Sequence, residues 1–445
     1  MKGSDGLNPE IIGVIGIAVM LILIFCRMWV GFAMILVGFI GCWIIGGWSQ
    51  IFNMAGSFGY ASMANYSMSC LPAFVYLGCL IYHTNMGADI FAALRAWLAK
   101  LRGGLAIATV GACAVFSALC GDGPSTAVTI GKISFEEMKK YGYSEKLAAC
   151  SSCAGGTIGP MIPPSIPFII FGVMTEQSIG QLFMAGVVPG VTQAVFYVIA
   201  ILIWCRIKPS IAPVAQPVPM RQKLKLSIGI APILIILIIM FGGLFSGLFT
   251  PTEAGAFSVF ATVIVSFAMR RLKKDNFYAS TKDAILSSCM VFFIILGAFL
   301  FTRFIVLSNL ALAAKTSLLY LNDVVGVPPL VIVLIIVVIY LIVGYFFDTL
   351  AAVLLTVPII FPIVTALGFN PIWWGVITIR VMNAGMITPP FGVNIFATAK
   401  AVNVPVTTLY KGMWPFVIAD VAHVVLLVLV PSISLWFPRL LGMMR

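Results

Sequence analysis

Charged side chains are scarce in this chain, and their scarcity excludes most kinds of water-soluble protein. Only 9% of the 445 residues are Asp, Glu, Lys or Arg, whereas 61% are hydrophobic and the mean hydropathy is +1.12. Soluble domains carry roughly 25% charged residues. So few charges cannot cover most of a surface that faces water. We therefore expect a protein that lies in a lipid bilayer.

The sequence also lacks the short motifs of common enzymes. It has no HExxH and no GxSxG, and its two histidines cannot form a multi-histidine metal site. A phosphate-binding loop fails as well, because Ile133 follows Gly131 and Lys132, and Thr126 stands where the first glycine belongs. The ten cysteines are scattered, mostly in apolar segments, as small hydrophobic residues are. We expect neither an enzyme nor ATP hydrolysis.

Apolar runs with the length of a bilayer-spanning helix recur along the whole chain. We count about eleven spans and two interrupted segments, and they must be helices because lipid leaves no other partner for the backbone. The basic residues gather between these runs, at 206–208, 221–225 and 270–274. That placement is typical of loops on the cytoplasmic side and not of a nucleic-acid surface. The first apolar run is expected to be retained as a helix.

Residues 87–102 differ from the spans. Phe91, Leu94 and Leu98 recur at helical spacing, while Arg95 lies elsewhere on the helix. The pattern predicts an amphipathic helix, either a brace in the membrane interface or a cap over a helix bundle.

Two regions interrupt the helical pattern at bilayer depth. In the first, an apolar run ends at CGDGPST (120–126), and CAGGTIGPMIPPSIPF follows at 153–168. In the second, FDTLAA (347–352) precedes NAGMITPPFG (383–392). Glycine and paired proline end helices, so each region predicts a broken helix followed by a re-entrant hairpin.

One constant offset relates the two regions. Adding 226 to residue numbers in the segment 122–189 brings Asp122 onto Asp348 and Gly159 onto Gly385, and the paired prolines onto each other, without a gap. The chain is therefore a duplication, and matched breaks in two repeats are typical of secondary transporters. We expect the repeats to be inverted relative to each other. We divide the chain into N-terminal scaffold helices (1–103), a first repeat core (104–206), connecting scaffold helices (207–325) and a second repeat core (326–445).

The two matched acids carry two open interpretations. Asp122 and Asp348 either help unwound carbonyls and hydroxyls to hold a hard cation such as Na⁺, or cap the helices that follow them. The hairpin tips offer inward carbonyls and free N–H groups that suit an anion. Arg380 either binds a carboxylate or sulfonate, or pairs with an acid of the protein.

Other charged residues in apolar runs predict structural roles. Thr250, Pro251 and Glu253 have the spacing of a capping box at a helix start. Asp420 and His423 have no counterparts in the other repeat, which favours pairing inside the protein.

At these residues the chain resembles the large permease subunit of TRAP transporters, the DctM-like family. The resemblance rests on four long stretches, at 159–190, 247–257, 347–362 and 386–405, within a match from about residue 10 to residue 440. It implies an all-α elevator-type importer of a small organic anion, driven by Na⁺, in the cytoplasmic membrane of a bacterium or archaeon. It also implies a small membrane subunit and an extracytoplasmic binding protein as partners.

By the same resemblance, the functional residues fall into three groups. One cation site would use Gly121, Asp122, Ser125, Thr157 and Gly159. The other would use Asp348, Asn383, Gly385 and Thr388. The substrate would lie near Pro164, Ser165, Pro390 and Asn394, with Arg380 as a further candidate contact, although the family pattern has an uncharged residue at that position.

Three alternatives compete with this prediction. The first is a stand-alone ion-coupled anion transporter of the same superfamily, which would need no binding protein. A channel would need a continuous ring of polar residues, and an intramembrane enzyme would need a nucleophile with a base, or metal ligands. The sequence offers neither of these last two sets.

Overall fold

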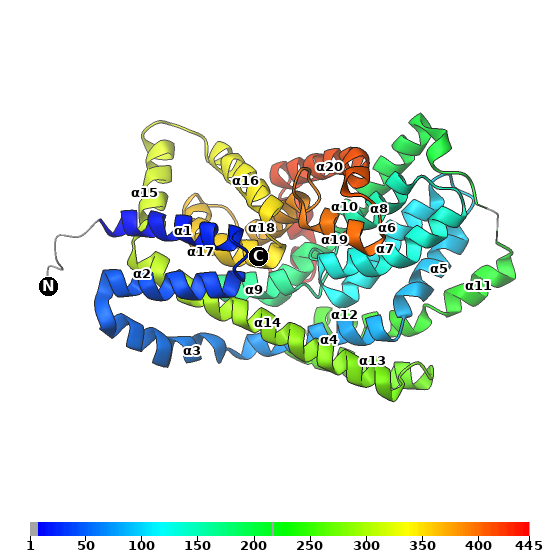
Figure 1. Ribbon diagram of the computed structural model, residues 1–445, viewed down its shortest axis with the longest axis horizontal. Helices are drawn as coiled ribbons and strands as arrows, with labels where there is room; N and C mark the ends of the chain where they lie inside the picture. The colour runs from blue at the N-terminus through cyan, green and yellow to red at the C-terminus, as the bar shows by residue number, and fades with distance from the viewer. Residues whose placement is uncertain (1–7, 216–217, 445) are drawn as a thin grey trace.

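The computed structural model describes residues 8–215 and 218–444, and within these ranges the chain is all helical (Figure 1). Seven of the described helices are long and apolar enough to cross a membrane, and the bent pair α11 and α12 makes an eighth. Three shorter apolar helices, α1, α6 and α9, add to them. The predicted class, an all-α polytopic membrane protein, is confirmed.

The elements follow the order that the apolar runs predict. The N-terminal part contains α1 (Pro9–Phe25), α2 (Val30–Asn53), the π-helical turn η1 (Met54–Phe58), α3 (Gly59–Met63), the 3-10 turn η2 (Tyr66–Ser69), α4 (Cys70–His83) and α5 (Met86–Leu98). The middle contains the 3-10 turn η3 (Pro209–Ile211), α11 (Met220–Ile228), α12 (Ala231–Phe245), α13 (Pro251–Ala268), α14 (Lys274–Leu307) and α15 (Leu310–Asp323). The C-terminal helix is α21 (Ser432–Leu440).

Under the offset of 226, each helix of the first repeat begins within one residue of its counterpart in the second repeat. The first repeat contains α6 (Gly104–Cys120), α7 (Gly123–Lys140), α8 (Glu145–Gly156), α9 (Ile166–Thr175) and α10 (Ile179–Ile207). The second contains α16 (Pro329–Phe346), α17 (Thr349–Ala366), α18 (Pro371–Gly385), α19 (Val393–Ala401) and α20 (Val406–Leu429). The offset carries both ends of α7 onto the ends of α17. In each repeat, two helices separated by a break precede a helical hairpin and a long helix.

The two repeats interlock. Helix α9, the second arm of the first hairpin, packs on α17, and α19, the corresponding arm of the second hairpin, packs on α7. Helices α10 and α20 also pack on each other. The second arm of each hairpin therefore rests on the broken helix of the other repeat, while the first arm packs on the broken helix of its own repeat. The two repeats share one interior.

Four helices outside the repeats, α2, α4, α13 and α14, pack on one another as an outer layer. The long helix α14 crosses the molecule diagonally in Figure 1 and packs along α2 and α4, and α13 packs on α4. Large apolar side chains such as Phe52 and Phe267 are more than half exposed on this layer. Such side chains are unfavourable in water and suit contact with lipid.

The amphipathic helix predicted at 87–102 is present as α5. Its apolar face packs on α6, while Trp97 stays half exposed. Its charged side chains connect two layers, because Arg95 forms an ion pair with Glu137 of α7, and Asp89 forms one with Arg271, just after α13. Helix α5 therefore braces the first repeat against the outer layer.

Candidate functional site

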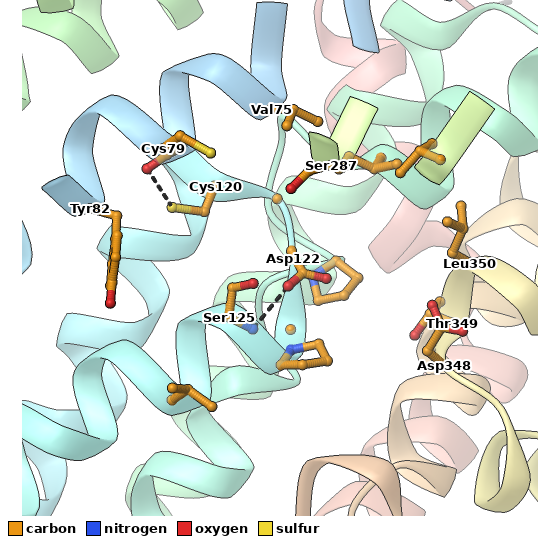
Figure 2. Close-up of a pocket in the computed structure, with 18 of the residues that line it drawn as sticks. Val75, Cys79, Tyr82, Cys120, Asp122, Ser125, Ser287, Asp348, Thr349 and Leu350 are labelled. Atoms are coloured by element: carbon orange, nitrogen blue, oxygen red, sulfur yellow. Dashed lines mark hydrogen bonds between the residues drawn. The ribbon is translucent and has the colours of Figure 1, made fainter. Parts of the chain in front are cut away.

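A cavity of about 600 Å³ lies between the two breaks and the outer layer (Figure 2). Residues of both breaks line it, together with residues of α4 and α14. Its volume lies within the range of roughly 300–1,000 Å³ typical of small-molecule sites. A second cavity, of about 620 Å³, is lined by residues of neither break. The first cavity is therefore the candidate site.

The first break lies between α6 and α7. Gly121 ends α6 with φ of 63°, a conformation that favours glycine, and Asp122 is the N-cap of α7. The Asp122 side chain accepts a hydrogen bond from the backbone N–H of Ser125 at 2.9 Å, as Figure 2 shows. The capping interpretation of Asp122 is thus correct. Both Asp122 and Ser125 also line the cavity, so capping does not remove the carboxylate from the site.

The first hairpin packs directly on this break. A Cβ atom added to Gly121 would lie 2.0 Å from the carbonyl oxygen of Pro164, at the hairpin tip. One added to Gly159 would lie 3.0 Å from the carbonyl oxygen of Asp122. The missing side chains therefore allow the backbone of the break and the backbone of the hairpin to meet.

Thr157 does not line the cavity and supports the hairpin from outside it. Its hydroxyl donates to the carbonyl of Ala154 at 2.7 Å and lies 2.7 Å from the hydroxyl of Tyr197. Gln193 donates to the same oxygen at 2.9 Å. The side chain therefore fastens the end of α8 to α10.

The second break repeats the pattern with different contacts. Asp348 is the N-cap of α17 and lines the cavity, close enough to Asp122 for their charges to interact. Thr349 follows it, lines the cavity and donates to Oδ1 of Asn383 at 2.6 Å, which ties the break to the second hairpin. Both acid-bearing breaks therefore face one cavity, although 226 residues separate them.

Gly385 and Thr388 have local roles in the second hairpin. A Cβ on Gly385 would lie 2.6 Å from the backbone of Gly344, so this glycine lets α18 approach α16. The hydroxyl of Thr388 donates to the carbonyl of Ala384 at 2.7 Å.

The available oxygen atoms fit a hard cation better than a transition metal. The described part of the chain contains no group of three or more His, Cys, Asp or Glu side chains placed to hold a metal ion. The breaks instead offer carboxylate, hydroxyl and carbonyl oxygens, the ligands of hard cations. Buried Asn394 has no hydrogen-bond partner for either side-chain polar atom among the described residues, and Asn383 has none for Nδ2. Such orphaned groups fit a site that gains a ligand.

Comparison with known proteins identifies the family. The family described as "Tripartite ATP-independent periplasmic transporter, DctM component" matches residues 17–433. This chain belongs to that family. It is 30% identical over 385 residues to the C4-dicarboxylate TRAP transporter large permease protein DctM of Pseudomonas aeruginosa, covering 86% of this chain and 89% of the relative. Other relatives are named for sialic acid, isethionate and ectoine.

Two further similarities cover almost the whole permease. The sialic acid large permease SiaM of Vibrio cholerae is 28% identical over 423 residues, covering 94% of this chain and 96% of the relative. The crystal structure of the Alcanivorax borkumensis YdaH transporter superposes with a TM-score of 0.61 at 12% identity, covering 96% of this chain and 98% of that one. This last likeness shows the fold alone. The relatives are transporters, as expected for a chain without enzyme motifs.

The predicted substrate contacts do not line this cavity, and their contact with a substrate stays a prediction. Pro164, Ser165, Arg380, Pro390 and Asn394 are all absent from the cavity wall, and Pro160, Ile166, Pro167 and Met386 represent the hairpins there. For two of these residues, the structure shows which groups of the protein their polar atoms bind. The hydroxyl of Ser165 donates to the carbonyl of Pro160 at 2.5 Å and caps α9, and the carbonyl of Pro390 accepts a hydrogen bond from Tyr410.

Arg380 lies in a buried ion pair instead of the cavity. Its side chain is fully buried, its Nη2 pairs with Asp420 of α20, and its Nε donates to Nδ1 of His423 at 2.9 Å. Nε2 of His423 lies 2.8 Å from the hydroxyl of Thr192 on α10. Of the two interpretations of Arg380, the structure shows the pairing with an acid of the protein, and contact with substrate stays a prediction. The pairing predicted for Asp420 and His423 is confirmed.

Two polar residues of the cavity wall escaped the sequence reasoning. His83 ends α4 and Asp283 lies in α14, and their side chains, both in the cavity lining, are 2.8 Å apart. An acid within a long apolar helix is a signal in itself. Asp283 lies close to the basic segment 270–274, however, so in the sequence it looks like an ordinary charged residue near the end of a helix.

We expect Gly121→Ala to destabilise the permease much more than Gly368→Ala. Both glycines have positive φ, 63° and 83°, so an alanine strains the backbone similarly. Only at Gly121 would the new Cβ collide, because Gly368 has no atom within 4 Å of that position. The measurement is the thermal unfolding midpoint of the purified permease in detergent. Equal shifts for the two variants would contradict the packing of break on hairpin.

The buried ion pair gives a second prediction. Arg380→Met should lower the unfolding free energy by about 3–5 kcal/mol, because it leaves Asp420 buried without its partner. The double variant Arg380→Met with Asp420→Leu should recover most of that loss, since neither charge is then buried. Thermal unfolding of the three proteins measures both effects. A double variant that is no more stable than Arg380→Met argues against the pairing as the main role of Arg380.

Proposed function

We propose that this permease couples the uptake of a small organic anion to Na⁺. The observation that carries the proposal is the meeting of both acid-bearing breaks at one cavity. Each break offers a carboxylate and nearby oxygens that suit a hard cation, and each precedes a helix whose N-terminus favours negative charge. Cations and an anionic solute could therefore share the site.

Two groups of residues would hold the cations. At the first break they are Gly121, Asp122, Ser125 and Gly159, with Thr157 holding the hairpin in place. At the second break they are Asp348 and Asn383, with Gly385 and Thr388 shaping the hairpin. Bound cations would neutralise Asp122 and Asp348, which otherwise repel each other and any anion. Solute and cation would thereby favour each other's binding.

The packing supports an elevator-type movement. The hairpins and broken helices interlock across the two repeats, whereas α2, α4 and α14 form a layer of their own. The cavity lies between these two bodies. A rigid shift of the repeats against the layer would carry the site across the bilayer, with α5 as the connection.

We assign the chain to the cytoplasmic membrane of a bacterium or archaeon, with the basic segments on the cytoplasmic side. Its expected partners are a small membrane subunit and an extracytoplasmic binding protein, in keeping with the tripartite family. The relatives' solutes suggest succinate, isethionate and N-acetylneuraminate as first anions to test.

Uptake of one of these anions into proteoliposomes should require an inward Na⁺ gradient. The liposomes should contain the permease with its cognate small subunit and binding protein, and radiolabelled anion measures uptake. Replacing Na⁺ by K⁺ should abolish accumulation, and adding ATP should not restore it. Accumulation that persists in K⁺, or no uptake of any of the three anions, would contradict the proposed function.

Omitting the binding protein should reduce uptake to background, even at high solute concentration. The reason is that the partner delivers the solute to the permease. The same liposomes, assayed with and without that protein, provide the comparison. Saturable uptake by the permease without it would favour the stand-alone transporter.

A further inference from the structure

The cavity wall presents an electrostatic problem for an anionic solute. Its described lining contains three carboxylates, those of Asp122, Asp348 and Asp283, but no lysine or arginine. Arg380, one candidate contact from the sequence, is buried elsewhere beside Asp420. His83 is thus the one lining residue whose side chain can carry a positive charge.

His83 is held in a defined orientation by Asp283. Its Nε2 lies 2.8 Å from Oδ2 of Asp283, and the two side chains are 20% and 52% exposed. An ionised carboxylate only accepts hydrogen bonds, so Nε2 must carry the proton. The other ring nitrogen, Nδ1, has no hydrogen-bond partner among the described residues. The pair therefore presents one ring nitrogen that is free to bind a ligand.

We propose that His83, oriented by Asp283, is the contact on the outer-layer wall that recognises the carboxylate or sulfonate of the transported anion. An anion bound to Nδ1 requires a proton there, and the ring then stands as an imidazolium between Asp283 and the solute. A hydrogen bond between opposite charges is stronger than a neutral one. The inference rests on the proposed function, and it names the residue that selects an anion at that site.

The position of the pair gives the contact a directional role. Asp122 and Asp348 belong to the repeats, whereas His83 and Asp283 belong to α4 and α14 of the outer layer. Figure 2 shows Asp122 and Asp348 from different elements turned toward the same space. If the repeats shift against the outer layer, the solute meets His83 only while the cavity faces this wall. His83 thus contributes to anion affinity in one of the two orientations.

Substitution at this pair should leave the fold intact, because both side chains reach the cavity surface. We expect His83→Gln to raise the KM for the anion that the wild-type complex transports, among succinate, isethionate and N-acetylneuraminate. The rise should be on the order of tenfold to a hundredfold, as for one lost hydrogen bond to a charged group. The maximal rate and the Na⁺ concentration for half-maximal uptake should change little. His83→Lys should keep most of the affinity, because it retains a cation.

Two controls separate this role from a structural one. Asp283→Asn leaves the imidazole in place and should change the KM less than His83→Gln does. A pair that merely joined α4 to α14 would make both variants equally harmful to expression and maximal rate. Lys139→Gln breaks an exposed ion pair with Glu145 outside the cavity and should leave every parameter unchanged.

The outcomes also separate the inference from the proposed function. A wild-type complex without Na⁺-driven anion uptake contradicts the proposed function itself. A working wild-type complex whose KM is the same with His83→Gln overturns the role of His83 alone. An equal loss with His83→Gln and His83→Lys overturns it as well, because charge would then be irrelevant.

Discussion

A lipid bilayer offers the backbone no hydrogen-bond partners, so an interrupted helix inside it must be covered by other parts of the protein or line a cavity. Both breaks of this permease do so. Gly121 lies against the carbonyl of Pro164, and Thr349 is bonded to Asn383, so each hairpin closes over the break of its own repeat. The residues of the breaks that the hairpins leave uncovered, including the two acids, line the cavity. The backbone groups at the breaks need to be covered or to face a cavity. This need determines where the hairpins, the broken helices and the cavity lie relative to one another.

The two repeats solve this problem with the same helices but different side chains. Tyr197 of α10 and His423 of α20 occupy equivalent positions under the offset, and each fastens a hairpin arm, through Thr157 in one repeat and Arg380 in the other. The second contact brings a buried charge, which Asp420 balances. Duplication thus preserved the place of the fastening contact and not its chemistry. Arg380 has no charged counterpart in the first repeat, and its pairing with Asp420 explains why the second repeat can bury it.

The sequence predicted the fold well where a pattern is periodic or repeated. Span lengths, the capping box of Thr250 and Glu253, the helix that became α5 and the duplication all appear in the structure. Asp122 was placed at the break, and its capping bond was one of two open interpretations. The sequence could not tell which polar groups already satisfy one another. Arg380 and Asp420 are 40 residues apart, and His83 and Asp283 are 200 apart, so only the packing of helices reveals these pairs. The cavity wall depends on such pairs, and its composition was therefore missed.

The central claim is that the two breaks together bind the coupling cations. The most direct test is equilibrium binding of ²²Na⁺ to the purified permease, compared with Asp122→Asn and Asp348→Asn. We expect saturable binding by the wild-type protein, weaker binding by each single variant and no binding when both substitutions are combined. Both variants should unfold cooperatively, which shows that they remain folded. A wild-type permease that binds no Na⁺, or a folded double variant that binds it with unchanged affinity, would contradict the account.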